Sequence, residues 1–159
     1  MTNYCEAEDA ALAFIYCDYQ EQSQQSAANL LANIVKQLVV SMPTAFQPLE
    51  DLYERCLKRN TKPNLEDLES LLVSICSACA KSFIILDALD ECSIPERKTL
   101  LRLLQKLKSN KLKVFATSRP HAQDLERLFK EEAKLQISAV EEDIRDYVIS
   151  RIDDDEDLS

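Results

Sequence analysis

Residues 83–92 have the sequence FIILDALDEC, in which four apolar residues are followed by three carboxylates within five positions. The short apolar run predicts a buried strand over residues 83–86. Carboxylates that lie so close together repel one another, and burying them without partners costs several kcal/mol. The stretch therefore indicates a strand end that faces a cation or a charged ligand.

On both sides of this stretch, short apolar runs and leucines at helical spacing predict an alternation of strands and helices. The runs predict strands at 12–17 and 113–117 and a weaker strand at 135–137. Apolar residues at helical spacing predict helices between them. The expected helix starts are Ser23 or Ser26, Pro48, Asn64, Ser93 with Glu96 as a capping box, a short helix near 122–130, and Ser138 with Glu141 as a second capping box. Strands alternating with helices predict an α/β domain with a mostly parallel sheet.

Composition limits the classes of function. The chain has 159 residues, of which 46% are hydrophobic, which is typical of one globular domain. Its net charge is −9, but residues 141–159 hold nine acids against Arg145 and Arg151, so the rest is nearly neutral. The sequence shows no cluster of Lys and Arg residues of the kind that binds nucleic acid. We expect a cytoplasmic protein with no membrane or nucleic-acid partner and an acidic tail at 153–159.

The cysteines include a C-x-x-C pair, Cys76 and Cys79. This pair ends an expected helix and precedes a strand, whereas thioredoxin-type pairs open a helix, where the dipole lowers the thiol pKa. A zinc site would need two further ligands, and the chain has one histidine. We therefore expect buried structural thiols.

The acids after residue 86 and one arginine form a candidate site. In a parallel sheet, ligands bind beyond the carboxyl ends of the strands, where Asp87 and Arg119 are both expected. We interpret Asp87 as a holder of Mg²⁺ through water and Asp90 or Glu91 as a residue that positions an attacking water. Arg119 would then sense a phosphate. The alternative is that Asp90 and Glu91 only favour the start of the next helix through its dipole.

The order of these segments resembles a known family. FIILDALDEC, followed after a leucine-rich helix by KVFATSRP, is similar to the Walker B and sensor-1 segments of NACHT domains, a STAND class of P-loop NTPases. The nearest resemblance is to the nephrocystin-like N-terminal domain of fungal NLR-like and ankyrin-repeat proteins. AFIYCDYQEQ near the start and VEEDIRDYVISRI near the end are also similar to segments of that group.

The resemblance implies a P-loop NTPase-like three-layer α/β domain over residues 1–152. Its sheet would be mostly parallel with three or four strands, and its first strand and P-loop would be missing. The strands at 12–17, 83–87 and 112–117 would still pair side by side. The strand at 134–137 would lose its neighbour, and would dock on the strand at 112–117, stay loose or await a partner chain. The family's cofactors are Mg²⁺ and ATP or GTP.

The chain contains no glycine, so these residues cannot form the glycine-rich Walker A loop that holds the phosphates. We therefore expect a fragment of a STAND-type signalling NTPase with little or no nucleotide hydrolysis of its own. The alternative is a nucleotide-independent interaction module that pairs with full-length NACHT or ankyrin-repeat proteins. The two hypotheses differ in whether Mg²⁺-dependent nucleotide binding can be detected.

Overall fold

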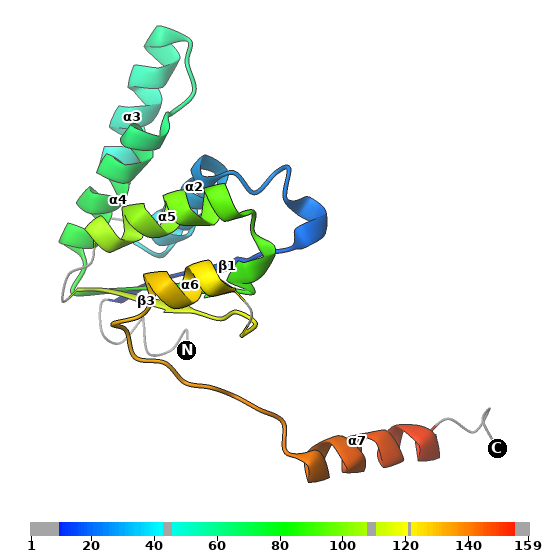
Figure 1. The fold of residues 1–159 in the computed structure, drawn as a ribbon. Helices are drawn as coiled ribbons and strands as arrows, with labels where there is room; N and C mark the ends of the chain where they lie inside the picture. Colours follow the sequence, from blue (N-terminus) through cyan, green and yellow to red (C-terminus); the bar gives the residue numbers. More distant parts are fainter. Residues whose placement is uncertain (1–9, 43–45, 108–110, 121, 155–159) are drawn as a thin grey trace. The chain divides into compact units, whose positions relative to one another are not determined.

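The computed structural model describes residues 10–42, 46–107, 111–120 and 122–154 (Figure 1). It divides into two compact units, Met1–Gln123 and Asp124–Ser159. The elements in chain order are β1 (Ala10–Tyr16), η1 (Tyr19–Glu21), α2 (Ala27–Ser41), α3 (Phe46–Arg59), α4 (Leu65–Ala78), β2 (Lys81–Asp87), η3 (Leu89–Glu91), α5 (Ile94–Lys106), β3 (Leu112–Ala116), α6 (Gln123–Leu128) and α7 (Glu141–Asp154).

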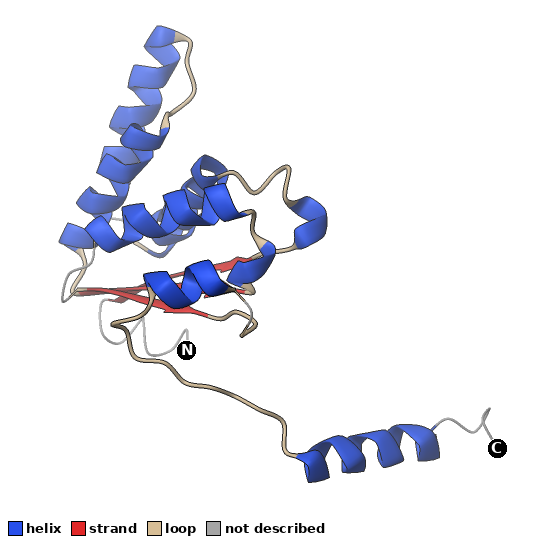
Figure 2. Cartoon of the chain, viewed as in Figure 1, coloured by secondary structure: helices blue, strands red, loops and turns tan. Residues whose placement is uncertain are grey.

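The three strands of the first unit form one parallel sheet in the order β1-β2-β3 (Figure 2). This arrangement confirms the predicted α/β class and the predicted side-by-side pairing of the three strands. Phe14 lies opposite Ile85, and Ile85 lies opposite Phe115. Because side chains alternate between the two faces of a strand, these three residues share one face of the sheet.

The core lies on the other face. Ala13 and Ile15 of β1 and Ile84 and Leu86 of β2 are buried there. Helix α2 packs on β1 and against α4 and α5, and these helices lie on one side of the sheet (Figure 1). Among the described elements of this unit there is one helical layer, so the second layer of the predicted three-layer domain is not formed by them.

Two predicted helix starts are confirmed. The Ser26 hydroxyl accepts a hydrogen bond from the Asn29 N–H at 3.2 Å and caps α2. Asn64 caps α4, and Asp67 completes a capping box in which each side chain accepts from the backbone N–H of the other residue. These bonds satisfy backbone donors that have no partner within the helix.

The predicted capping box at Ser93 is wrong. Helix α5 begins there, but the Ser93 side chain makes no capping hydrogen bond. The Glu96 carboxylate instead accepts a hydrogen bond from the Ala27 N–H, 2.5 Å away, in the first turn of α2. A tertiary contact has replaced the local one, because the first N–H groups of α2 also need acceptors. Glu96 thereby ties α5 to the start of α2.

Helix α3 begins at Phe46, two residues before the predicted start at Pro48. Proline is tolerated in a first turn, where its missing N–H is not needed. The helix ends at Arg59, and the next residue, Asn60, has a φ of 51° in the left-handed region. Leu52 and Cys56 of this helix are buried, whereas Tyr53 is exposed.

The second unit contains nearly all of helix α6, helix α7 and the segment that connects them. The predicted strand at 135–137 is not formed, and Leu135 and Ile137 are exposed. The segment is therefore not a strand in this chain, and whether it pairs with a partner chain stays a prediction. Helix α7 begins at Glu141 and the Ile144 N–H bonds the Val140 carbonyl, so the predicted cap at Ser138 is two residues early. The last part of the predicted acidic tail, 155–159, lies outside the described residues.

Candidate nucleotide-binding edge of the sheet

The carboxyl edge of the sheet brings the ends of the three strands together. The Asp87 carbonyl, at the end of β2, accepts a hydrogen bond from the Cys17 N–H at 3.0 Å, just after β1. The Leu89 N–H donates to the Thr117 carbonyl at 2.9 Å, just after β3. Backbone hydrogen bonds thus continue past the strands, and they fix the positions of the acids that follow β2.

Asp87 is held by a residue that the sequence did not single out. The Thr117 hydroxyl donates to Oδ1 of Asp87 at 2.5 Å and accepts from the Ala88 N–H at 2.9 Å. A hydroxyl has one proton to donate, so this pair of bonds gives Thr117 a single orientation. One oxygen of a half-buried carboxylate is thereby occupied, and the other is available to a water molecule or a cation.

The turn after Asp87 has an unusual backbone. Ala88 has φ 51° and ψ 44°, in the left-handed region that glycine adopts readily. An L-residue with a Cβ pays about 1 kcal/mol or more for this conformation. The turn points the next two acids, Asp90 and Glu91, toward the end of β3.

We expect Ala88→Gly to raise the free energy of unfolding by about 0.5–1 kcal/mol, because glycine has no Cβ to clash in this region. Ala32→Gly, inside α2, is the matched control and should lower it by about 1 kcal/mol. Chemical denaturation of the two variants beside the parent chain measures both effects. A loss of stability in both variants would contradict the account of the turn.

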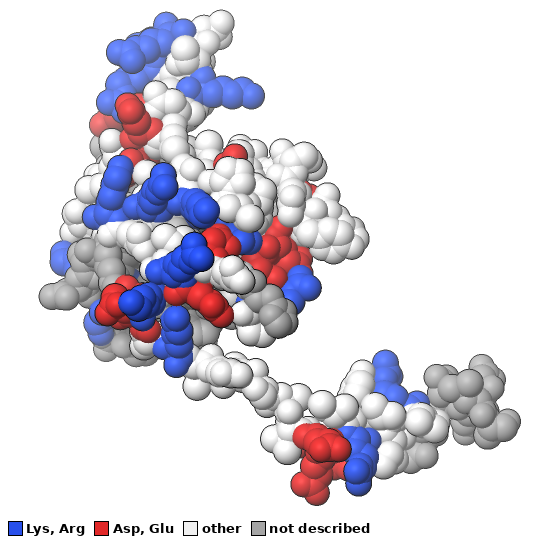
Figure 3. Space-filling model, viewed as in Figure 1, with Lys and Arg blue, Asp and Glu red and all other residues white. Residues whose placement is uncertain are grey.

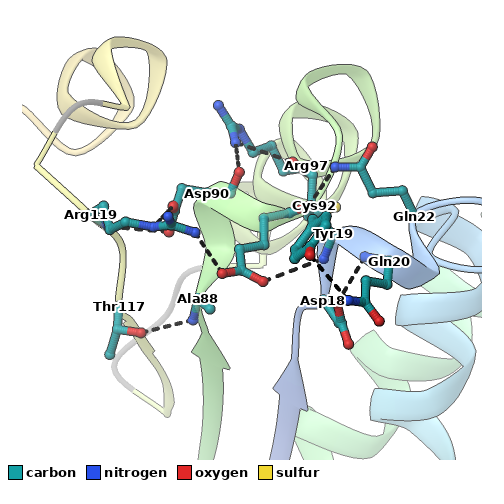
Figure 4. Close-up of polar contacts among 11 residues, drawn as sticks. Asp18, Tyr19, Gln20, Gln22, Ala88, Asp90, Cys92, Arg97, Thr117 and Arg119 are labelled. Atoms are coloured by element: carbon teal, nitrogen blue, oxygen red, sulfur yellow. Dashed lines mark hydrogen bonds and ion pairs between the residues drawn. The ribbon is translucent and has the colours of Figure 1, made fainter.

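Arg119 meets both acids (Figure 4). Its Nε lies 2.8 Å from Oδ2 of Asp90, and its backbone N–H donates to Oδ1 at 3.1 Å. Its Nη2 lies 2.6 Å from Oε1 of Glu91. The arginine side chain is 67% exposed, so these ion pairs contribute roughly 1 kcal/mol each at most. The structure thus brings Asp90, Glu91 and Arg119 into one cluster next to Asp87.

Glu91 is also bonded to the segment that follows β1. Its Oε2 accepts a hydrogen bond from the Tyr19 N–H at 3.4 Å. Its carbonyl accepts a hydrogen bond from the Gln22 side chain at 2.8 Å. In the same segment, the Asp18 carboxylate accepts a hydrogen bond from the Gln20 N–H at 2.8 Å and caps η1 (Figure 4). The cluster therefore joins residues from all three strand ends.

A buried arginine of helix α5 supports the same turn. Arg97 of α5 is 5% exposed, and its Nη1 donates to the carbonyls of Asp90 at 2.7 Å and Cys92 at 3.1 Å (Figure 4). Arg97 was not among the site residues expected from the sequence. Its spacing could have indicated it. Arg97 lies three residues before Leu100 and seven before Leu104, so it falls on the apolar stripe of the helix, where a charged residue needs a buried partner.

Two thiols also connect β1 to this turn. Cys17 and Cys92 are buried and free, and their side chains share a hydrogen bond. That hydrogen bond raises the pKa of the Cys17 thiol, with burial acting in the same direction, and it lowers the pKa of the Cys92 thiol. Cys76 and Cys79 of the C-x-x-C pair are buried thiols outside any disulfide, in line with the prediction, and burial raises the pKa of the Cys76 thiol.

Within the described residues, no group of three or more His, Cys, Asp or Glu side chains could hold a metal ion. Asp87 fits a Mg²⁺ ion held through water, which needs one or two carboxylates and further oxygens from a phosphate. The described residues do not surround it with a preformed set of metal ligands.

In Figure 3, basic and acidic side chains are mixed over the surface that faces the viewer. None of the helices in the described ranges is both long and apolar enough to span a membrane.

Comparison with known proteins identifies the family. Residues 1–119 match the family described as Nephrocystin 3, N-terminal. The chain belongs to the nephrocystin 3 N-terminal family. The matched region includes the whole sheet and the cluster of Asp87, Asp90, Glu91 and Arg119. Arg119 is the last matched residue. No curated protein and no solved structure matches the chain.

Proposed function

We propose that this chain is the Walker B and sensor-1 part of a NACHT-type domain of a STAND signalling NTPase. It would be of the type found in fungal NLR-like and ankyrin-repeat proteins, acting in the cytoplasm. The observation that supports this proposal most strongly is the joint position of Asp87, Asp90, Glu91 and Arg119 at the carboxyl edge of a parallel sheet. Ligands of open α/β sheets bind at this edge.

In this proposal each residue has a separate role. Asp87, oriented by Thr117, holds Mg²⁺ through water, and the ion would neutralise charge on the phosphates of ATP or GTP. Asp90 or Glu91 positions a water molecule. Arg119 binds the terminal phosphate, for which its planar guanidinium is well suited. In the ligand-free chain Arg119 is paired with the two acids instead, so a phosphate must compete with them for it.

The phosphate-binding loop is the part that this chain cannot supply. Its 159 residues contain no glycine, so the backbone amides and lysine of such a loop would come from another polypeptide segment. Without them most contacts to the triphosphate are absent. We therefore expect binding in the millimolar range and no measurable hydrolysis by this chain alone.

A second candidate function is a nucleotide-independent interaction module that pairs with full-length NACHT proteins. One observation favours it: Arg119 already pairs with both Asp90 and Glu91, so these two acids have a cationic partner without a ligand. In that case the acids and the arginine serve to lock the strand ends together. The two candidates predict different responses to nucleotide.

A thermal-shift titration with Mg²⁺ and ATP, ADP or GTP distinguishes them. At a nucleotide concentration of about twice Kd, binding to the folded state stabilises it by about 0.6 kcal/mol, or roughly 2 °C in melting temperature. We expect this shift with about 10 mM Mg²⁺–ATP, and we expect it to vanish in Asp87→Asn and when EDTA removes the metal.

The matched control is Asp67→Asn, because Asp67 lies in the capping box of α4 and outside the cluster. Its melting temperature will be lower, but its shift with nucleotide should equal that of the parent chain. Equal shifts in the parent chain and Asp87→Asn, or no shift in either, would reject the nucleotide site and leave the interaction module.

A further inference from the structure

The sheet has an open face that the described helices of its unit do not cover. This open face consists of the alternate residues that point away from the core, Leu12, Phe14, Tyr16, Phe83, Ile85 and Phe115. The central row, in register across the three strands, is Phe14, Ile85 and Phe115. The face is therefore a contiguous apolar surface and not a set of scattered residues.

The aromatic side chains on the open face are accessible to water. Phe14 is 47% exposed, Tyr16 is 71% exposed and Phe115 is 59% exposed. Phe14 and Tyr16 are in edge-to-face contact, with ring centroids 5.6 Å apart. Contiguous exposed apolar surface of this kind is typical of an interaction site. A strand face that stays in water usually carries polar side chains instead.

Charged residues of opposite sign lie at the two ends of this face. Lys81 and Lys113 are exposed at the end where the strands begin. Asp87 lies on the same face at the end where β2 finishes, and it is half-buried. Lys113 is paired in register with Phe83, so it borders the apolar centre directly. The face is thus basic at one end, apolar in the middle and acidic at the other end.

We propose that the open face binds the open face of a second copy of this chain, with the strands of the two sheets running in opposite directions. A two-fold axis then brings the aromatic rows together and sets Lys113 of each copy near Asp87 of the other. A parallel arrangement would set lysines against lysines, so the charges select the antiparallel one. This inference rests on the open face and not on nucleotide binding, but Lys113 of the second copy and a Mg²⁺ ion would compete for Asp87.

The size of the face sets the expected affinity. Three strands about 4.8 Å apart, with about 3.3 Å per residue, offer roughly 300 Å² of flat face per copy. Stable interfaces bury about 800 Å² per partner. We therefore expect a weak dimer, with a dissociation constant on the order of 100 µM.

Sedimentation equilibrium of the full chain from about 5 µM to 1 mM tests this proposal directly. The expected result is a monomer–dimer equilibrium. Phe115→Lys should raise the dissociation constant at least about tenfold, because it buries a charge in the aromatic row. Lys113→Glu should raise it by a smaller factor through repulsion from Asp87. Val40→Lys, at an exposed apolar residue of α2 outside the open face, should leave it unchanged.

Two results would overturn the proposal. One is a monomer at every concentration. If Phe115→Lys then lowers the melting temperature of that monomer, a segment of the same chain covers the face. The other is a dimer that Phe115→Lys and Val40→Lys affect equally, since that dimer would use another surface. Circular dichroism of each variant checks that it is folded.

Discussion

Arg97→Met is expected to lower the free energy of unfolding by about 3 kcal/mol. The guanidinium donates hydrogen bonds to the carbonyls of Asp90 and Cys92 inside the protein, and Arg97 is 5% exposed. Methionine keeps much of the apolar stem but leaves both carbonyls without these donors. Each unsatisfied buried polar group costs about 1–3 kcal/mol. Urea denaturation of the variant and the parent chain measures the difference.

Arg102→Met is the matched control, because Arg102 lies on the same helix and is exposed. It should change stability by less than about 0.5 kcal/mol. The buried arginine also holds the turn that carries Asp90, so Arg97→Met should loosen the contact between Asp90 and Arg119. A loss below about 1 kcal/mol in Arg97→Met would mean that water or another group replaces the guanidinium, contrary to this account.

Ile84→Ala is expected to lower the free energy of unfolding by about 3–4 kcal/mol. Ile84 lies in the central strand and is completely buried under the helices. Its truncation removes apolar contact and leaves a cavity that the surrounding helices fill only in part. For a chain of this size the melting temperature should fall by about 10 °C. Differential scanning calorimetry provides the measurement.

Its neighbour Ile85 supplies the control on the same strand. Ile85 points to the open face and is half-buried, so Ile85→Ala should cost about 1 kcal/mol at low micromolar protein, where the chain is monomeric. Similar losses for Ile84→Ala and Ile85→Ala would show that both faces of the monomer's sheet are covered. That result would contradict the one-sided core and the open face together.

Sequence reasoning located the strands well and their environment less well. The continuous apolar run from Phe83 to Leu86 predicted a buried strand. The strand is present, but Phe83 and Ile85 are only half-buried. A run of apolar residues gives the propensity of the strand, whereas the number of helical layers depends on elements far away in the chain.

Local rules failed where distant contacts competed with them. Ser93 and Glu96 have the spacing of a capping box, yet Glu96 bonds the start of α2. The weak strand at 135–137 needed a neighbouring strand to pair with, and none of the described residues provides one. Thr117 supports the candidate site through a bond to Asp87, 30 positions away, and Arg97 through a bond to Asp90, seven positions away. The spacing of the acids did not reveal either contact.

The candidate site itself was predictable because parallel topology fixes it. Once strands β2 and β3 are neighbours, Asp87 and Arg119 must approach the same edge. What the sequence did not indicate was the direct pairing of Arg119 with Asp90 and Glu91. Because of that pairing, a phosphate that binds Arg119 must displace the two carboxylates, and the change in the environment of Arg119 can be measured.

The central claim is that Mg²⁺–nucleotide binds this edge and draws Arg119 away from the two acids. The most direct measurement is a ¹H–¹⁵N NMR titration of the Arg119 Nε–H signal, assigned by its loss in Arg119→Lys. The account predicts that the signal shifts progressively with Mg²⁺–ATP in the millimolar range and does not shift in Asp87→Asn. An Arg119 signal that stays unchanged at about 10 mM Mg²⁺–ATP, about twice the expected Kd, would contradict it.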